Sequence, residues 1–208
     1  MGPLHGIRVL ELTQAVAGPS CGRILAEMGA EVLKIESLEG DPYRNTNTVV
    51  PNEGKRFQSL NLGKKSIAIN LKHEDGQQLV HDLAIDSDVL LTNFRFGVPE
   101  RLGFGYVQIQ AINPRLIYAR ITGFGTKSSQ VARPASDPMM QSYSGLTVNG
   151  GKLNEEGLPI LANNTIADYS AGMGAAIGIL GALLARTHTN TGQLVDASLL
   201  RGALVLQD

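Results

Sequence analysis

The chain has 208 residues, of which 43% are hydrophobic and 18% charged, and its formal net charge is −1. This length suffices for one α/β domain or two small ones with a buried core. The charge is balanced and the basic residues are scattered, so the sequence lacks the basic cluster that is typical of binding to nucleic acid or to a membrane surface. We therefore expect neither nucleic acid nor membrane among the partners.

A single cysteine, Cys21, leaves no partner for an internal disulfide and fits a reducing compartment. The first residues lack the basic and apolar regions of a secretory signal. The apolar run at 171–185 is shorter than a bilayer-spanning helix. We expect a cytoplasmic location, or the mitochondrial matrix if the source is eukaryotic.

The first part of the chain predicts strand, helix and strand in succession. Apolar strands are expected at 7–12 and 30–36, separated by a Gly- and Pro-containing loop at 13–22 and a helix at 21–29 that Gly29 ends. Residues 37–59 are polar and rich in Asn, Pro and Gly. They predict a long surface loop.

The same alternation continues through the middle of the chain. Strands are predicted at 65–71, 88–94 and 115–125, and helices at 73–85 and 105–113. The periodicity places Leu79, Val80 and Leu83 on one face of the helix at 73–85. In the segment at 98–104, Pro99 stands at a position that the first turn of a helix would tolerate. Short apolar strands alternating with helices predict an α/β fold with a doubly wound parallel sheet.

The last third begins with residues 126–164, which are loop-like, and continues with a segment of Gly, Ala and other apolar residues headed by Asp168. A strand at 194–200 then runs into a further helix. Asp is a favoured helix N-cap and suits the positive end of the helix dipole, so spacing alone favours capping over catalysis for Asp168. The small residues behind it predict close backbone packing, which would hold the acid on a rigid element.

Common site motifs are mostly missing. Glu36 ends a strand where a ribose-binding acid often stands, but the preceding loop lacks G-x-G-x-x-G, so a dinucleotide site is not favoured. Gly18 and the adjacent N–H groups still form a generic anion site at a helix N-terminus. The four histidines and Cys21 show no metal-ligand spacing, and we expect no metal site.

Basic residues gather around the predicted strand at 65–71. Lys64, Lys65 and Lys72 suit either a solvated strand end or a phosphate-binding edge, to which Arg95 and Arg101 would contribute. Residue types alone leave both interpretations open.

Four motifs, taken together and in order, resemble the class III CoA-transferases. They are the "PLHGIRVLEL…GD" stretch at 3–41, "NLGKKSIAINLK" at 61–72, "TNFRFGVPERLGF" at 92–104, and "DYSAGMGAAIG…TNTGQLVDASLL" at 168–200. The resemblance implies a Rossmann-like parallel sheet with flanking helices, without the family's second, smaller domain. It also implies that residues 1–208 are the N-terminal, nucleotide-binding portion of a chain truncated at its C-terminus, and that the full-length form is a homodimer.

The resemblance implies a mechanism as well. Asp168 would attack the thioester of an acyl-CoA, form a mixed anhydride and then an aspartyl-CoA thioester, and pass CoA to an acceptor carboxylic acid. Coenzyme A is then a substrate, and no separate cofactor or metal is implied. By the same matching, the residues expected to contact CoA are Ala17, Gly18, Ile69, Asn70, Leu71, Lys72, Asn93, Phe94, Arg95 and Arg101.

Three departures from the family's patterns narrow the function. The formyl-CoA branch of the family has a glutamine where this chain has Val16 and a basic residue where it has Ser37. Both differences argue against formyl-CoA as the substrate. Ser136 stands where the family's racemases have a histidine, so one of their two bases is missing and transfer is favoured over racemisation. A non-catalytic CoA-binding module with an exposed apolar face is the third alternative.

Overall fold

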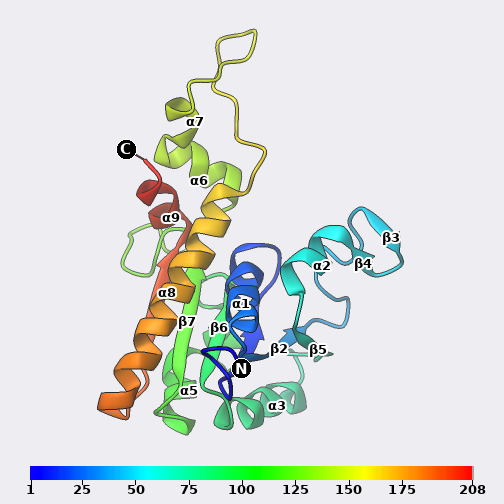
Figure 1. Ribbon diagram of the computed structural model, residues 1–208, viewed down its shortest axis with the longest axis vertical. Coiled ribbons are helices and arrows are strands. Elements are labelled where there is room, and N and C mark those ends of the chain that lie inside the picture. Colours follow the sequence, from blue (N-terminus) through cyan, green and yellow to red (C-terminus); the bar gives the residue numbers. More distant parts are fainter. Residues whose placement is uncertain (208) are drawn as a thin grey trace.

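A six-stranded parallel sheet forms the centre of the molecule in the computed structural model, which describes residues 1–207 (Figure 1). The strand order is β5-β2-β1-β6-β7-β8, and every neighbouring pair is parallel. The strands are β1 (Arg8–Leu12), β2 (Glu31–Glu36), β5 (Lys65–Ala68), β6 (Val89–Thr92), β7 (Ile117–Thr122) and β8 (Leu194–Ser198). The predicted doubly wound α/β fold is confirmed.

The inner strands β2, β1, β6 and β7 are buried on both faces, which explains why they are mostly apolar. Along β6, Val89 and Leu91 belong to one hydrophobic cluster and Leu90 to the other. In β7 the side chain of Tyr118 likewise points away from the cluster that takes Ile117. Successive side chains of a strand point to opposite faces, so each inner strand supplies both cores, whereas the edge strand β5 is exposed.

Helices cover the two faces. The helices are α1 (Ala17–Glu27), α2 (Lys55–Asn61), α3 (Glu74–Ile85), α4 (Val98–Arg101), α5 (Tyr106–Ile112), α6 (Asp137–Ser144), α7 (Leu146–Asn149), α8 (Ile166–Thr189) and α9 (Leu199–Val205). Helices α1 and α8 pack on one face of the sheet, and α3 and α5 on the other (Figure 1). The strand order reverses at β1, which has β2 on one side and β6 on the other. In sheets of this type ligands bind at that reversal, beyond the carboxyl ends of the strands.

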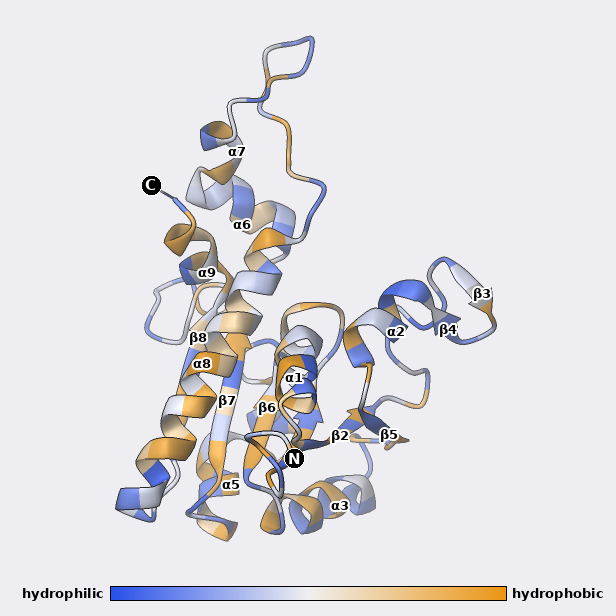
Figure 2. Cartoon of the chain, in the orientation of Figure 1, coloured by the Kyte–Doolittle hydropathy of each residue, from blue (hydrophilic) through white to orange (hydrophobic). Residues whose placement is uncertain are grey.

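Helix α8 is hydrophobic or neutral along most of its length (Figure 2). Its most apolar 18-residue window has a mean hydropathy of 1.4, enough by length and composition for a membrane span, and 44% of that window is buried in the fold. Close contacts account for two of its glycines, because a Cβ at Gly172 would lie 2.7 Å from the Ala17 carbonyl oxygen and one at Gly178 would lie 2.7 Å from Val195. The opposite face exposes Met173 and Ile177.

Two segments predicted to be loops contain regular elements. Residues 37–59 hold a hairpin of β3 (Thr48–Val50) and β4 (Glu53–Gly54), followed directly by the start of α2, and 126–164 holds α6 and α7. Both segments project from the sheet in Figure 1. Their elements are short and bury few apolar residues, so they leave no periodic pattern in the sequence.

Two further predictions need correction. Helix α1 begins at Ala17 rather than at Cys21, because Pro19 falls in the first turn, where its missing N–H is no loss. In α3 the predicted apolar face is shifted, since Val80 and Ala84 are buried whereas Leu79 is 39% exposed.

Candidate active site

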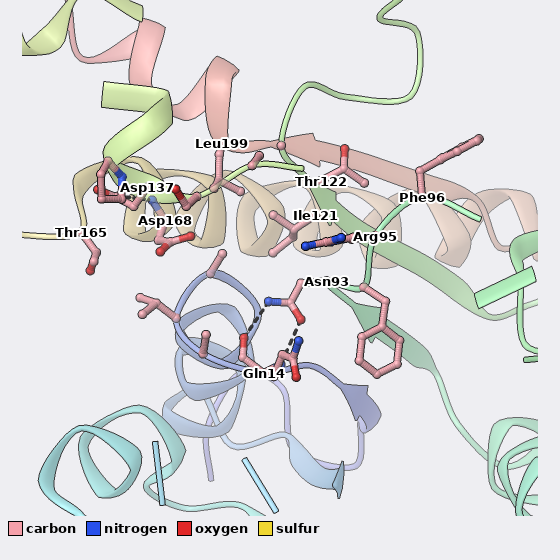
Figure 3. Close-up of a pocket in the computed structure, with 18 of the residues that line it drawn as sticks. Gln14, Asn93, Arg95, Phe96, Ile121, Thr122, Asp137, Thr165, Asp168 and Leu199 are labelled. Atoms are coloured by element: carbon pink, nitrogen blue, oxygen red, sulfur yellow. Dashed lines mark hydrogen bonds between the residues drawn. The ribbon is translucent and has the colours of Figure 1, made fainter. Parts of the chain in front are cut away.

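Two loops meet where the strand order reverses. The backbone N–H of Gln14, after β1, donates to the Asn93 Oδ1 atom, after β6, at 2.9 Å, and the Asn93 amide donates back to the Gln14 carbonyl oxygen at 2.8 Å (Figure 3). The side chain of Asn93 is thereby engaged with protein backbone. This reciprocal pair fixes the spacing of the two loops at the place where doubly wound folds bind ligands.

Two adjacent cavities open beside this pair of loops. One, of about 550 Å³, contains Asp168, and the other, of about 420 Å³, is lined by residues 69–72. Gln14 and Phe94 belong to the walls of both. Each volume is typical of a small-molecule site, and the two cavities adjoin at Gln14 and Phe94.

A buried charge network lies beneath the loop that follows β1. The Glu11 carboxylate is fully buried, accepts a bond from the Thr13 hydroxyl at 2.6 Å, and pairs with Lys64 at 2.8 Å and Lys34 at 3.4 Å. Lys64 also donates to the Pro19 carbonyl oxygen at 2.8 Å. The network therefore ties the start of α1 to the sheet. It also removes Lys64 from the proposed phosphate-binding edge, because its side chain is buried and paired.

Glu36, at the end of β2, is also engaged. The Arg44 guanidinium donates to both of its carboxylate oxygens, at 2.6 and 2.7 Å, and the backbone N–H of Asp41 donates at 3.0 Å. Burial alone would raise the pKa of Glu36, but the Arg44 and Ser66 hydrogen bonds, with the Arg44 charge, hold it below its ordinary value. Its carboxylate is thus already paired and not free for a ribose.

Asp168 is the third residue of α8, and it does not cap its own helix. The N-cap is Thr165, whose side chain makes no capping bond, and the Asp168 N–H instead donates to the Asp137 carboxylate of α6 at 2.9 Å. Among the described residues, nothing donates a hydrogen bond to the Asp168 carboxylate, which faces the larger cavity (Figure 3). The capping role that spacing favours for Asp168 is therefore wrong, because Asp137 performs it from another element.

Asp137 is held firmly in this role. It is 4% exposed, and its second carboxylate oxygen accepts a bond from the Gln141 side chain. Gln141 in turn bonds to the backbone at Ala162 and Asn164, just before α8. Both oxygens of Asp137 are thus used inside the protein, whereas those of Asp168 are left for the cavity.

The surroundings raise the pKa of Asp168 to about 7. Burial is the largest cause and the negative charge of Asp137 the second, while the positive charge of Arg56 acts in the opposite direction. The carboxylate consequently changes protonation state close to neutral pH. A strongly perturbed acid in a cavity is a feature typical of catalytic sites.

One basic and one aromatic residue of the site could not be recognised as site residues from the sequence pattern. Arg56, from α2, and Tyr43 line the cavity that contains Asp168. The Arg56 guanidinium donates to the Thr165 hydroxyl at 3.0 Å and lies 4.9 Å from the centre of the Tyr43 ring. Both come from the segment predicted as a surface loop, and only the tertiary fold brings them to α8.

The structure places most of the residues expected to contact CoA around the two cavities. Those lining the larger cavity are Ala17, Asn93, Phe94 and Arg95, and those lining the smaller one are Ile69, Asn70, Leu71, Lys72 and Phe94. Gly18 and Arg101 line neither. Gly18 is packed against Thr13, where a Cβ would overlap the threonine side chain, and Arg101 is exposed in α4.

Cys21 is buried and forms no disulfide. Burial, with the nearby Glu11 charge, raises the pKa of the Cys21 thiol far above its ordinary value. Within residues 1–207 no group of three or more His, Cys, Asp or Glu side chains is arranged to hold a metal ion.

Known proteins resemble this chain in sequence and in fold. The acyl-CoA transferase of Fusarium pseudograminearum is 39% identical over 99% of this chain and 47% of its own length. The acetyl-CoA:oxalate CoA-transferase of Acetobacter aceti is 38% identical over 98% of this chain and 52% of its own. A CAIB/BAIF family protein from Brucella suis has a crystal structure that superposes with a TM-score of 0.91 at 34% identity, over 99% of this chain and 55% of that one.

The chain spans about half the length of the curated relatives it matches. The sequence profile of CoA-transferase family III covers residues 4–208. This match extends over almost the whole sequence and agrees with the structural superposition, and the chain belongs to CoA-transferase family III.

Proposed function

We propose that this chain forms the CoA-binding, nucleophile-bearing part of an acyl-CoA:carboxylate CoA-transferase, in which Asp168 accepts the acyl group. One observation supports this above all: Asp137 caps α8, so the Asp168 carboxylate faces the cavity with no hydrogen bond from the described residues. Curated relatives with this chemistry in their names match nearly the whole chain. The full-length enzyme would act as a homodimer.

Coenzyme A would lie along the two cavities. Lys72, exposed at the smaller cavity, would meet a phosphate, and Ile69 would contact the nucleotide. The pantetheine arm would pass Gln14 and Phe94, which both cavities share, and bring the thioester to Asp168. The acyl-CoA is the substrate in this arrangement, and the protein supplies the nucleophile.

The transfer proceeds through two kinds of covalent intermediate. An Asp168 oxygen attacks the thioester carbonyl carbon, the C–S bond breaks, and CoA leaves as the thiolate from a mixed anhydride. The thiolate attacks the Asp168 carbonyl carbon, which releases the donor carboxylate and leaves an aspartyl-CoA thioester. The acceptor carboxylate then attacks this thioester and expels the thiolate again. Attack of the thiolate on the acceptor acyl carbon yields the new acyl-CoA and frees Asp168, with no net proton change.

The environment of Asp168 suits this role. Only the ionised carboxylate is nucleophilic, and a pKa of about 7 keeps a large fraction ionised near neutral pH while raising the basicity of that form. Burial also removes water that would hydrolyse an anhydride.

Racemisation is less well supported by the same cavity. A two-base mechanism needs a second proton acceptor opposite Asp168, and the position that the family's racemases give to histidine holds Ser136, which lines the cavity at the start of α6. A serine hydroxyl is not a base at neutral pH. Group transfer requires no such residue.

Trapping the anhydride tests the proposal. The 208-residue chain is incubated with an acyl-CoA and hydroxylamine, and the peptide containing Asp168 is examined by mass spectrometry for the aspartyl hydroxamate. We expect modification of Asp168 in the wild-type chain and in Asp86→Asn, an exposed control, but none in Asp168→Asn. A chain that stays unmodified, or that is modified at another acid, contradicts the proposal.

A further inference from the structure

Arg56 occupies an unusual position beside Asp168. It comes from α2, is half-buried, and lines the same cavity. Its guanidinium is fixed by a hydrogen bond of 3.0 Å to the Thr165 hydroxyl, one helical turn before Asp168, and by stacking 4.9 Å from the centre of the Tyr43 ring. Two independent contacts therefore hold this cation at the end of the cavity where α8 begins.

The charge of Arg56 is not neutralised inside the protein. Within residues 1–207 no carboxylate forms an ion pair with it, and the bond to Thr165 uses one of its five N–H donors. Its field reaches the nearby acid, since it lowers the pKa of Asp168 against the effects of burial and Asp137. A guanidinium with free donors in a small-molecule cavity is matched by an anion such as a carboxylate.

The other two arginines of the cavity are less suited to this place. Arg133 is exposed and bonded to Gln130 at 3.0 Å. Figure 3 shows Arg95 away from Thr165 and Asp168, beyond Ile121 and toward Phe96. Arg56 is the cation that Thr165, the N-cap of α8, holds in position.

We infer that Arg56 binds the carboxylate of the acceptor acid and aims one of its oxygens at the acyl carbon on Asp168. This inference rests on the proposed function, because the acceptor has to attack an aspartyl-CoA thioester. In that step a bond forms between the acceptor oxygen and the Asp168 carbonyl carbon, the C–S bond breaks, and CoA leaves as the thiolate. Arg56 holds the entering anion in place, and no proton has to move.

The inference has a consequence for binding that needs no turnover. The Asp168→Asn variant carries no charge at residue 168, and neither would the aspartyl-CoA thioester. It is therefore a suitable host for measuring carboxylate binding. Propionate serves as the probe and propionamide as its uncharged counterpart. Binding is followed through the 15Nε signal of Arg56 by NMR, assigned from its loss in the Arg56→Gln variant.

We expect propionate to shift the Arg56 Nε signal in a saturable manner and propionamide to leave it unchanged. A hydrogen bond to a charged group contributes enough that Arg56→Gln should weaken propionate binding about tenfold or more. Arg56→Lys should restore part of the affinity, since it keeps the charge but not the planar donor pair. Arg8→Gln, at an exposed arginine at the amino end of β1, should bind propionate like the host.

The outcomes separate the two proposals. An Arg56 signal that ignores propionate, or unchanged affinity in Arg56→Gln, overturns the role of Arg56 and leaves the trapping experiment to judge Asp168. Both proposals are supported if Arg56→Gln loses propionate binding in the Asp168→Asn host while the Arg56→Gln single variant, incubated with acyl-CoA and hydroxylamine, still forms the hydroxamate at Asp168. Propionate binding through Arg56 without any hydroxamate in the wild-type chain keeps an anion site but overturns its assignment to an acceptor.

Discussion

Replacing Asp168 by Asn should stabilise the folded chain, and the gain should grow with pH. Burial first, and then the charge on Asp137, raise the pKa of Asp168 from 3.8 to about 7 in the folded protein. A raised carboxyl pKa means that folding favours the protonated form. The stability contributed by this group is therefore fully present below about pH 3.8 and is lost as the pH rises through about 7. Asn is uncharged throughout and escapes this loss.

The size of the effect follows from the two pKa values. At about 1.4 kcal/mol for each tenfold change in acidity, the ionised Asp168 destabilises the folded chain by about 4 kcal/mol at about pH 8.5. At about pH 5.5 the same relation gives about 2 kcal/mol. The advantage of Asp168→Asn should hence increase by about 2 kcal/mol over this range.

Urea unfolding at both pH values measures this difference. The free energy of unfolding is compared among the wild type, Asp168→Asn and Asp86→Asn, which removes an exposed carboxylate at the end of α3. We expect Asp86→Asn to follow the wild type at each pH. A stability difference for Asp168→Asn that does not change with pH, or that shrinks as the pH rises, would refute the raised pKa and the burial argument behind it.

Four other substitutions test the helix packing, the buried charge network and the nucleotide site. Gly172→Ala should destabilise the chain by about 1–3 kcal/mol, because its Cβ would overlap α1. Gly174→Ala has open space around its Cβ and should stabilise the chain by about 0.5–1 kcal/mol. Urea unfolding compares the two variants, and equal effects on the free energy of unfolding contradict the packing of α8 on α1. Glu11→Gln should lower the free energy of unfolding by about 3 kcal/mol, because it leaves two buried lysines short of a partner, and a neutral result contradicts the network. Lys72→Gln should weaken CoA binding about fivefold in low salt by calorimetry, and unchanged affinity would remove this lysine from the nucleotide site.

The inner part of the sheet could be predicted from the sequence because its strands are buried on both faces. Runs such as Val89–Thr92 must be apolar wherever helices cover both sides, and each crossover helix carries its own apolar face. The hairpin and α2, by contrast, bury little, and their course is set by contacts with other elements. Arg23 of α1, for example, donates to the Ser59 carbonyl oxygen of α2 at 2.7 Å. A local pattern cannot encode such a contact.

The same limit applies to the site. The loops after β1 and β6 could be placed together from the topology alone, since parallel strands bring their carboxyl ends to one edge. The bond from Arg56 to Thr165 joins residues 109 positions apart. Only the docking of α2 beside the start of α8 creates it, which is why Arg56 and Tyr43 were missed although their residue types suit a carboxylate site.

Asp137 decides how Asp168 can be used. An acid in the first turn of a helix can satisfy a free backbone N–H or face a ligand, and a carboxylate bent back to the helix has less freedom to attack. Because Asp137 accepts the bond from the Asp168 N–H, helix α8 keeps this cap when residue 168 changes. A substitution at Asp168 should consequently abolish the proposed acyl transfer without unwinding the helix. A substitution at Asp137 should loosen the first turn of α8 and displace the Asp168 carboxylate with it. The two acids are therefore separable by experiment: Asp137 caps the helix, and this leaves the Asp168 carboxylate free to face the cavity.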